Sequence, residues 1–359
     1  MFIYVAQYQM TFYLVALRGF GMIFKSIKAL LAFGLLLLIN SISYAQEYPA
    51  MTIKFGDLLN RNFGYYQGIV AFKDEVEKRS GGKIKVEIIT DNKMGTPKDA
   101  LESLQLGAVQ MALNTPAYTQ GSVKEHMVWV LPYLFKDRET WQKFAYGPMG
   151  KELGDKIEPF GIKFISWCSA GGRGFISKKP LATPADFSGL KIRAIPDPVV
   201  VEIIKSFSGQ PVVMNIQEVY TSLQQGVLDG SELSIELATA FKFNEVAKFY
   251  TETAHNGTPG MVLTNLAWWN KQPKIVQDLI EQVVQTNFRK ANDEFYAAVD
   301  PRQSQQQQTA SAKVLADKSV TIVKPDLPAF KKASAPVIEQ FKSRIGKEYV
   351  EKVLKAVDY

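Results

Sequence analysis

The sequence predicts an α/β protein built from two lobes, and three observations lead to this fold class. Segments typical of strands and helices alternate from Met51 to residue 114, and a second alternating series begins near Ile162. The chain has 359 residues, which suits two domains of roughly 150 residues each. A long run of good helix formers follows the second series. We therefore expect two similar lobes, a ligand cleft between them and a long helix that spans both.

The first alternating series defines the first lobe. The expected strands are 51–56, 83–90 and 109–114, and the expected helices are 65–80 and 97–107. Strands that alternate with helices usually form a parallel sheet covered by helices. Ligands of such sheets bind beyond the carboxyl ends of the strands. The loops after Gly56 and Thr90, and the loop that starts at Thr115, are therefore candidate walls of a binding site.

The second series repeats this pattern. The expected strands are 162–170, 171–179, 190–195 and 211–214, and the expected helices are 197–209 and 217–226. From Asn270 to about Thr309 the sequence favours helix over far more residues than an average helix contains. The glutamine-rich segment 303–308 is interpreted as a solvated face of that helix.

The N-terminal residues 1–45 are interpreted as a secretory signal peptide. Lys25 and Lys28 precede the apolar run 29–39, and small residues flank a cleavage site after Ala45. The apolar run is about 11 residues long, whereas a membrane-spanning helix needs roughly 20. Residues 1–21 are explained by a start assigned too early, with Met22 as the natural start, although a membrane anchor over 1–40 is an alternative. The mature chain is expected to be soluble in the periplasm.

Charge and cysteine content exclude several classes of protein. The net charge is +7, and the signal peptide removes three positive and no negative side chains, which leaves +4. This charge is too small and too scattered to indicate a nucleic-acid partner. Cys168 is the only cysteine, so neither an internal disulfide nor a lipid-anchoring cysteine at the cleavage site is expected.

The sequence offers little material for catalysis. The only histidines are His126 and His255, and each is interpreted as a packed or capping residue. Cys168 lies in a strand-like run and is interpreted as a core residue. Motifs of common hydrolases, zinc enzymes and nucleotide-binding loops are missing from the sequence. We therefore expect no catalytic residue, no metal site and no cofactor.

Two arginines could bind an anion. Arg193 interrupts an apolar strand and is followed by Ala-Ile-Pro-Asp-Pro before a helix. A guanidinium at a strand end can donate two parallel hydrogen bonds to a carboxylate, but local sequence alone favours a structural ion pair or a surface position. Arg173 lies in the segment Gly-Gly-Arg-Gly, where glycines allow a ligand to approach the backbone, and a hairpin turn has the same pattern.

Taken in order, several segments resemble the solute-binding receptors of tripartite ATP-independent periplasmic (TRAP) transporters, the DctP-type family 7 extracellular receptors. The segments are EKRSGGKIKVEI, LESLQLGAVQMAL, VLPYLFKDRE, FSGLKIRAIPDPV, PVVMNIQEVYTSLQQGVLDGSE and KFNEVAKFYTETAH, within residues 52–356. The resemblance implies a periplasmic binding protein fold that closes by a hinge motion. It also implies a monomeric receptor whose partners are a carboxylate ligand and the small and large membrane subunits of the transporter. We expect lobe I at 47–170 plus 259–298 and lobe II at 171–258 plus 299–359.

The resemblance assigns roles to individual residues. It implies that Arg193 is the principal contact of the ligand carboxylate, and that Arg173, twenty residues earlier, is a second contact. Leu233 stands where family members typically have an asparagine that hydrogen-bonds the ligand, and Leu58 aligns loosely with a polar contact. A ligand with many hydroxyls would leave buried donors unpaired at such positions, which costs about 1–3 kcal/mol for each group. Sialic acid is therefore disfavoured, and a dicarboxylate, 2-oxo acid, hydroxy acid or aromatic carboxylate stays open.

Three further residues are candidates for the ligand site. Thr115 begins a loop at a strand end. Trp167 could form an apolar or stacking wall for an aromatic acid, or pack in the core. Glu232 could hydrogen-bond the ligand, hold a cation beside it, or have a structural role. The alternative functions are a receptor of an ATP-driven (ABC) importer and an exported enzyme that processes carboxylates.

Overall fold

The computed structural model describes residues 47–57, 59, 61, 64–91, 93–168, 171–257, 259–299 and 320–359. All of its helices and strands belong to one compact unit, Tyr48–Tyr359. The predicted signal peptide, Leu58 and the glutamine-rich segment 303–308 lie outside the described residues. Among the described residues, no helix combines the length and apolar character needed to cross a membrane.

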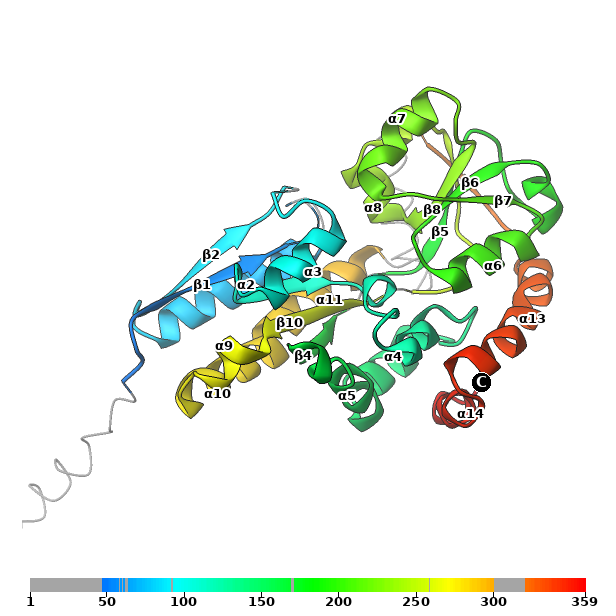
Figure 1. Ribbon diagram of the computed structural model, residues 1–359. Helices are drawn as coiled ribbons and strands as arrows, with labels where there is room; N and C mark the ends of the chain where they lie inside the picture. Colours follow the sequence, from blue (N-terminus) through cyan, green and yellow to red (C-terminus); the bar gives the residue numbers. More distant parts are fainter. Residues whose placement is uncertain are drawn as a thin grey trace, which may run out of the picture. The chain divides into compact units, whose positions relative to one another are not determined.

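One sheet contains strands from the first part of the chain and one late strand. Its strands are β1 (Met51–Gly56), β2 (Ile84–Ile89), β3 (Met111–Asn114), β4 (Ile162–Cys168) and β10 (Gly260–Asn265), in the order β2-β1-β3-β10-β4 (Figure 1). β1 pairs in parallel with β2 and β3, as the sequence predicts. β10, which was not expected from the sequence pattern, is antiparallel to β3 and β4, so the complete sheet is mixed. The reason is that β10 enters this sheet from the second sheet and runs in the opposite direction.

The second sheet contains the strands that carry both candidate arginines. Its strands are β5 (Arg173–Ser177), β6 (Lys191–Ala194), β7 (Gln210–Val213), β8 (Gly230–Ser234), β9 (Phe249–Thr251) and β11 (Thr321–Val323), in the order β11-β9-β5-β8-β6-β7. β6 is parallel to β7 and β8, whereas β5 is antiparallel to β8 and β9. β8, β9 and β11 were not expected from the sequence pattern, because they are short and two of them have only three residues.

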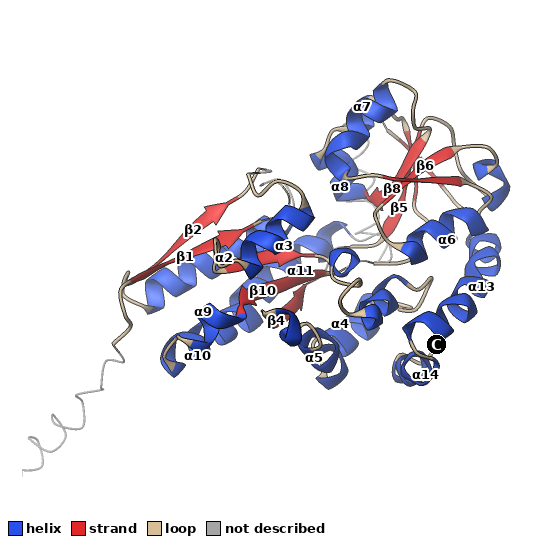
Figure 2. Ribbon diagram, viewed as in Figure 1, coloured by secondary structure: helices blue, strands red, loops and turns tan. Residues whose placement is uncertain are grey.

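Helices cover both faces of the first sheet (Figure 2). They are α2 (Gly64–Arg79), α3 (Pro97–Gln105), α4 (Arg138–Ala145), α5 (Pro148–Asp155), α9 (Leu266–Asn270), α10 (Lys274–Val283) and α11 (Arg289–Val299). Phe72 of α2 packs edge-on against Phe55 of β1, with ring centroids 5.5 Å apart. Burying such aromatic and aliphatic side chains supplies the main driving force for this layer.

The second sheet has its own covering helices. They are α6 (Pro198–Ser206), α7 (Val219–Gln224), α8 (Ile235–Ala240), α13 (Leu327–Ile345) and, beyond α13, α14 (Lys347–Ala356). Phe187, Phe207 and Phe330 pack against one another on the α6 side, with ring centroids between 4.8 and 5.8 Å apart. α13 and α14 were not assigned from the sequence, although α13 is the longest helix among the described residues.

The predicted long helix is only partly described. Its helical structure begins at Lys274 rather than Asn270, because Pro273 precedes it and suits a helix start. α10 continues through a π-helical turn (Val284–Phe288) into α11, which is described to Val299. Helical structure beyond residue 299 and the span of this helix across both lobes stay predictions.

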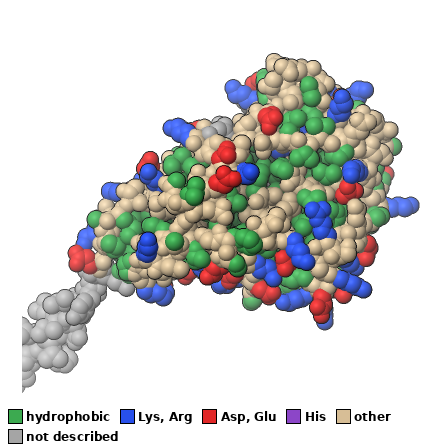
Figure 3. Space-filling view, in the orientation of Figure 1, with side chains coloured by type: hydrophobic (Ala, Val, Ile, Leu, Met, Phe, Trp, Pro, Cys, Tyr) green, Lys and Arg blue, Asp and Glu red, His purple; other side chains and the backbone are tan. Residues whose placement is uncertain are grey.

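The drawn surface carries charges of both signs. On the face shown in Figure 3, lysine and arginine side chains alternate with aspartate and glutamate in small groups, separated by neutral and apolar side chains. No extended field of one sign is visible on that face. The charges relevant to the candidate site are buried and lie at the strand ends of the second sheet.

Candidate functional site

Arg193 lies near the end of β6 and is almost completely buried. Only 2% of the residue is exposed, and its guanidinium donates hydrogen bonds to main-chain oxygens. Nε donates to the Met214 carbonyl at 3.0 Å, and Nη1 donates to the Glu232 carbonyl at 3.4 Å. Two carbonyl groups orient the guanidinium but do not neutralise its charge.

The charge of Arg193 has no carboxylate partner in the described part of the chain. The ion pairs formed by these residues include Arg173 and Glu232 but none with Arg193. Burial, and then the nearby charge of Arg173, lower the pKa of Arg193 from 12.5 to about 10. The guanidinium is still protonated at neutral pH. A buried cation without a counter-ion is costly, and an anionic ligand would supply the missing charge.

Arg173 lies at the start of β5 and is neutralised by Glu232. Its Nε and Nη2 atoms donate to the two carboxylate oxygens of Glu232, the second at 2.5 Å. Burial raises the pKa of Glu232, but the charge and hydrogen bonds of Arg173, with a smaller contribution from the nearby His255, outweigh this effect and hold it at about 2. Glu232 is therefore ionised at neutral pH and fully occupied by protein partners. This geometry gives Glu232 the structural role among its predicted alternatives.

His255 extends the ion pair. Its Nε2 atom lies 3.4 Å from the Glu232 carboxylate, and its Nδ1 atom lies 2.7 Å from the Thr253 hydroxyl. The imidazole stacks on Phe175 with ring centroids 5.0 Å apart. Burial lowers the pKa of His255, so the ring is neutral at neutral pH. The interpretation of His255 as a packed residue fits this environment, but its contact with Glu232 was not foreseen.

The two arginines occupy opposite faces of the second sheet. Arg173 pairs in register with Ser234 of β8, and Arg193 pairs with Ser231 of the same strand. Side chains alternate along a strand, so Glu232 and Ser234 share the Arg173 face, and Ser231 and Leu233 share the Arg193 face. Both guanidiniums nevertheless reach the Glu232 carbonyl, Arg173 Nη2 at 3.3 Å and Arg193 Nη1 at 3.4 Å.

Leu233 lies on the face where its predicted role requires it. It is two residues beyond Ser231, the register partner of Arg193, and is fully buried. The side chain belongs to the apolar cluster that includes Ile176 and Phe243. A leucine at this position makes the surroundings of Arg193 apolar on this side.

A turn of the first sheet contacts the segment that follows Arg193. Thr115 follows β3 and is the N-cap of a 3-10 turn, Pro116–Tyr118. The Gln120 amide donates to the Pro196 carbonyl at 3.1 Å, so this turn lies against the loop between β6 and α6. Tyr118 is half-buried, and its phenol interacts electrostatically with both Arg193 and Arg173. The structure thus brings the predicted Thr115 loop to the arginines. The sequence did not predict the interaction of Tyr118 with the arginines or that of Gln120 with the segment after Arg193.

Asp197 is a second buried carboxyl group near the arginines. Its side chain caps α6 by accepting a hydrogen bond from the Val199 amide at 2.8 Å, and Pro198 occupies the first helical position. Burial raises the pKa of Asp197 from 3.8 to about 7, and the charge of Glu232 adds to this increase. Asp197 is therefore partly protonated at neutral pH, and its raised pKa argues against a role as counter-ion of Arg193.

Trp167 lies in the aromatic core. It is fully buried, donates from Nε1 to the Gly150 carbonyl at 2.7 Å, and packs on Trp129 with ring centroids 4.6 Å apart. His126 packs edge-on against it and is held by Thr119 and the Leu153 carbonyl. With no exposed surface, Trp167 follows the core-packing alternative and is not brought together with the arginines.

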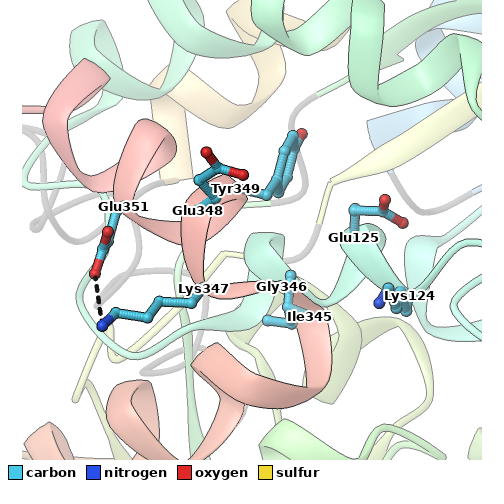
Figure 4. A pocket seen from close by; sticks show the side chains of 8 residues that line it. All are labelled: Lys124, Glu125, Ile345, Gly346, Lys347, Glu348, Tyr349 and Glu351. Carbon is cyan, nitrogen blue, oxygen red and sulfur yellow. Dashed lines mark ion pairs between the residues drawn. The ribbon is translucent and has the colours of Figure 1, made fainter.

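A separate surface pocket lies between the turn before Leu131 and the α13–α14 junction (Figure 4). It is lined by Lys124, Glu125, Ile345, Gly346, Lys347, Glu348, Tyr349 and Glu351. Lys347 pairs with Glu351 at 4.0 Å. The lining contains three glutamates and two lysines, so its acidic character makes it a poor site for a carboxylate ligand.

The described residues form two sheets covered by helices, with the buried guanidinium of Arg193 near the end of β6 and outside their ion pairs, an arrangement that suits a receptor for a small anion. The chain belongs to the bacterial extracellular solute-binding protein family 7 (DctP), whose family model matches residues 55–344. It is a receptor of the TRAP type with the two-lobed fold of that class. The earlier resemblance and fold class are thereby confirmed.

Individual relatives agree with this assignment. The C4-dicarboxylate-binding periplasmic protein DctP of Rhodobacter capsulatus is 29% identical over 326 residues, which cover 88% of this chain and 95% of the relative. A TRAP periplasmic solute-binding protein of Shewanella oneidensis with bound succinate has a TM-score of 0.78 and 25% identity, and the match covers 86% of this chain and 100% of that one. A similar protein from Sulfitobacter sp. NAS-14.1 with bound β-D-galacturonate has a TM-score of 0.77 and 25% identity, over 86% of this chain and 99% of that one.

Proposed function

We propose that this chain is the periplasmic receptor of a TRAP transporter, binding a small organic acid through Arg193 and delivering it to the small and large membrane subunits. In this proposal residues 1–45 direct export and are removed after Ala45. The receptor closes around its ligand by a hinge motion between its lobes. It performs no chemistry on the ligand itself.

The observation that carries the proposal is the state of Arg193. Its guanidinium is buried and oriented by two carbonyl groups, and no carboxylate among the described residues neutralises it. A carboxylate ligand would satisfy both the charge and the remaining N–H donors, and such a pair is stronger away from water than at the surface. Arg173 supports the site indirectly, since its charge is already paired with Glu232 and its guanidinium contacts the same carbonyl as Arg193.

The relatives support a carboxylate as the ligand. Solved receptors with this fold contain succinate in one case and galacturonate in another, and both are carboxylates. These ligands differ in size, charge and number of hydroxyls. The comparison therefore supports the shared carboxylate contact and leaves the rest of the ligand to the individual site.

Binding by variants of Arg193 tests this function. In a calorimetric screen of purified mature protein against small carboxylates, we expect at least one acid to bind and to leave the calorimeter cell chemically unchanged. Arg193→Lys and Arg193→Ala should reduce its affinity by about a hundredfold or more, because lysine cannot form the bidentate contact and alanine removes the charge. Arg344→Lys, an exposed substitution on α13, is the matched control and should bind like the wild type.

Three results would contradict the proposal. Wild-type affinity in both Arg193 variants would rule out Arg193 as the contact of the ligand carboxylate. Turnover of the acid would point to the enzyme alternative. Uptake that depends on ATP and on an ABC-type permease, rather than on the two TRAP membrane subunits, would favour the other class of transporter. Circular dichroism and thermal unfolding of each variant confirm that a loss of binding is not a loss of folding.

A further inference from the structure

We infer that the ligand of this receptor is a monocarboxylate whose other end bears hydroxyl or keto groups, rather than a dicarboxylate. This inference rests on the proposed carboxylate contact of Arg193 and adds the chemical class of the remainder of the ligand. It follows from two independent features of the site, which are its net charge and its neutral polar groups without partners.

The first feature is the charge at the strand ends. Arg173 and Glu232 neutralise each other, so Arg193 supplies a single uncompensated positive charge. Asp197 lies close enough to Glu232 and Arg173 for their charges to shift its pKa. The ionised fraction of Asp197 reduces the net positive charge further. The site therefore matches one negative charge on the ligand.

Two further arginines of the described residues, Arg61 and Arg289, have their guanidiniums held by other groups. Arg61, in the loop after β1, is paired with Asp91 at 2.5 Å, and its side chain is 61% exposed. Arg289 donates to the Ser166 hydroxyl at 2.7 Å and lies over the Tyr146 ring at 4.1 Å, a position on α11 beside the first sheet.

A second ligand carboxylate would therefore lie near buried acids, and among the described residues beside Arg193 no second unpaired cation is placed to receive it. Glu232 is ionised, and Asp197 titrates near neutral pH. Like charges in a buried environment repel one another strongly, and removing a carboxylate from water costs free energy that no partner offsets. A neutral hydroxyl or keto group avoids both effects.

The second feature is a set of neutral polar atoms around the arginines that have no hydrogen-bond partner among the described residues. Ser231 is fully buried, is the register partner of Arg193, and its hydroxyl is unpartnered. Asn256 is 4% exposed, and its side-chain Oδ1 and Nδ2 atoms are both unpartnered. Its main-chain carbonyl accepts a hydrogen bond from the main-chain N–H of Arg173 at 3.0 Å. Thr115 and Gln120 each contribute a further unpartnered side-chain oxygen from the turn of the first sheet.

Buried polar atoms in native proteins are usually satisfied, so a group of them beside a buried cation indicates a polar ligand. The unpartnered atoms are hydroxyls, amide oxygens and one amide nitrogen, which pair with hydroxyl and keto groups. Leu233 limits how many such groups the ligand carries, because it makes one side of the site apolar. A small acid with one to a few hydroxyl or keto groups satisfies all of these conditions.

Matched pairs of ligands test the inference on the wild-type mature protein. Isothermal titration compares succinate with 4-hydroxybutyrate, and malate with 3,4-dihydroxybutyrate, where one carboxylate is exchanged for a hydroxymethyl group. We expect the hydroxy acid of each pair to bind at least about tenfold more tightly, with the binding lost in Arg193→Ala. Tighter binding of the dicarboxylates, still dependent on Arg193, would overturn this inference and leave the proposed function intact. Binding of none of the acids, or binding that survives Arg193→Ala, would instead contradict the proposed function and the inference with it.

Two side-chain deletions locate the hydroxyl contacts. Ser231→Ala and Asn256→Ala should each weaken binding of the preferred hydroxy acid by about three- to tenfold, and should leave the weaker binding of butyrate, which lacks the hydroxyl, unchanged. Asn244→Ala is the matched control, because Asn244 is also buried and its Oδ1 atom is also unpartnered. Equal losses for the hydroxy acid and for butyrate would show that these residues only support the fold and would overturn their assignment.

Discussion

The ends of β5 and β6 each place a buried arginine at the same edge of the second sheet, but the two regions differ in how the charge is balanced. Arg173 at β5 is paired with Glu232, which His255 also contacts. Arg193 at β6 has only carbonyl partners among the described residues. Both residues are at least 95% buried, so burial alone does not distinguish their roles.

This difference separates a supporting cation from a binding cation. A buried ion pair is costly to break, because removal of one partner leaves the other charge in an apolar environment. A buried cation without a partner already destabilises the unliganded protein, and binding of an anionic ligand removes this cost. The two arginines should therefore respond in opposite ways to substitution, and three measurements test this expectation.

The largest expected effect is on stability at Arg173. Arg173→Ala should lower the free energy of unfolding by about 3–5 kcal/mol, because it leaves the Glu232 carboxylate buried without its cation. Urea denaturation followed by circular dichroism measures this change. The double variant Arg173→Met with Glu232→Leu removes both charges and should recover most of the loss. A loss below about 1 kcal/mol in Arg173→Ala would mean that the two arginines are energetically alike.

An intermediate effect concerns the pH dependence that Asp197 contributes. Its pKa is raised from 3.8 to about 7 by burial, so the folded state binds the proton more tightly than the unfolded state. Stability should therefore fall as the pH rises from 4 to 7, by up to about 1.4 kcal/mol per pH unit from this group. Asp197→Asn should flatten this slope in urea titrations at several pH values.

The same substitution at an exposed helix cap, Asp186→Asn, is the control for Asp197. The change of slope that it causes between pH 4 and 7 is subtracted from the change caused by Asp197→Asn. If Asp197→Asn instead made the fall in stability with rising pH steeper than in the wild type, Asp197 would be ionised at neutral pH and would be a counter-ion of Arg193. That outcome would remove the contrast between the two arginines.

The smallest expected effect is on stability at Arg193. Arg193→Met should change the free energy of unfolding of the unliganded protein by less than about 1 kcal/mol, or increase it, because the substitution removes an uncompensated buried charge and keeps an apolar side chain. Thermal and urea unfolding of ligand-free protein measure the change. A destabilisation as large as that of Arg173→Ala would reveal a structural partner of Arg193.

The core elements around the site follow from local sequence patterns. Apolar alternation predicted β1, and helical spacing predicted α2 and α6 within a few residues of their observed ends. These patterns report burial of one face, which is a local property of a strand or helix. The short strands β9 and β11 escaped prediction, since three residues give too little periodicity and their pairing partners lie far away in the chain.

The site was predictable to different degrees. Arg193 and Arg173 were identified through the resemblance of their segments to a known family, and the structure brings both to one carbonyl group. Asn256, Tyr118 and Gln120 gave no signal in the sequence, because a neutral polar side chain in a loop is ordinary until its neighbours are known. Trp167 was placed near the ligand as one of two alternatives, and the core-packing alternative prevailed because β4 is covered on both faces.

By itself, the sequence determined the alternation of strands and helices and the position of Arg193 near a strand end. Only the tertiary structure decided which arginine is neutralised. Glu232 is 59 residues from Arg173 and 39 residues from Arg193 along the chain, and it offers its carboxylate to the first and its main-chain carbonyl to the second. That choice depends on the register of β8 between β5 and β6. Register sets which side chains share a face, and it is a property of paired strands rather than of any one segment.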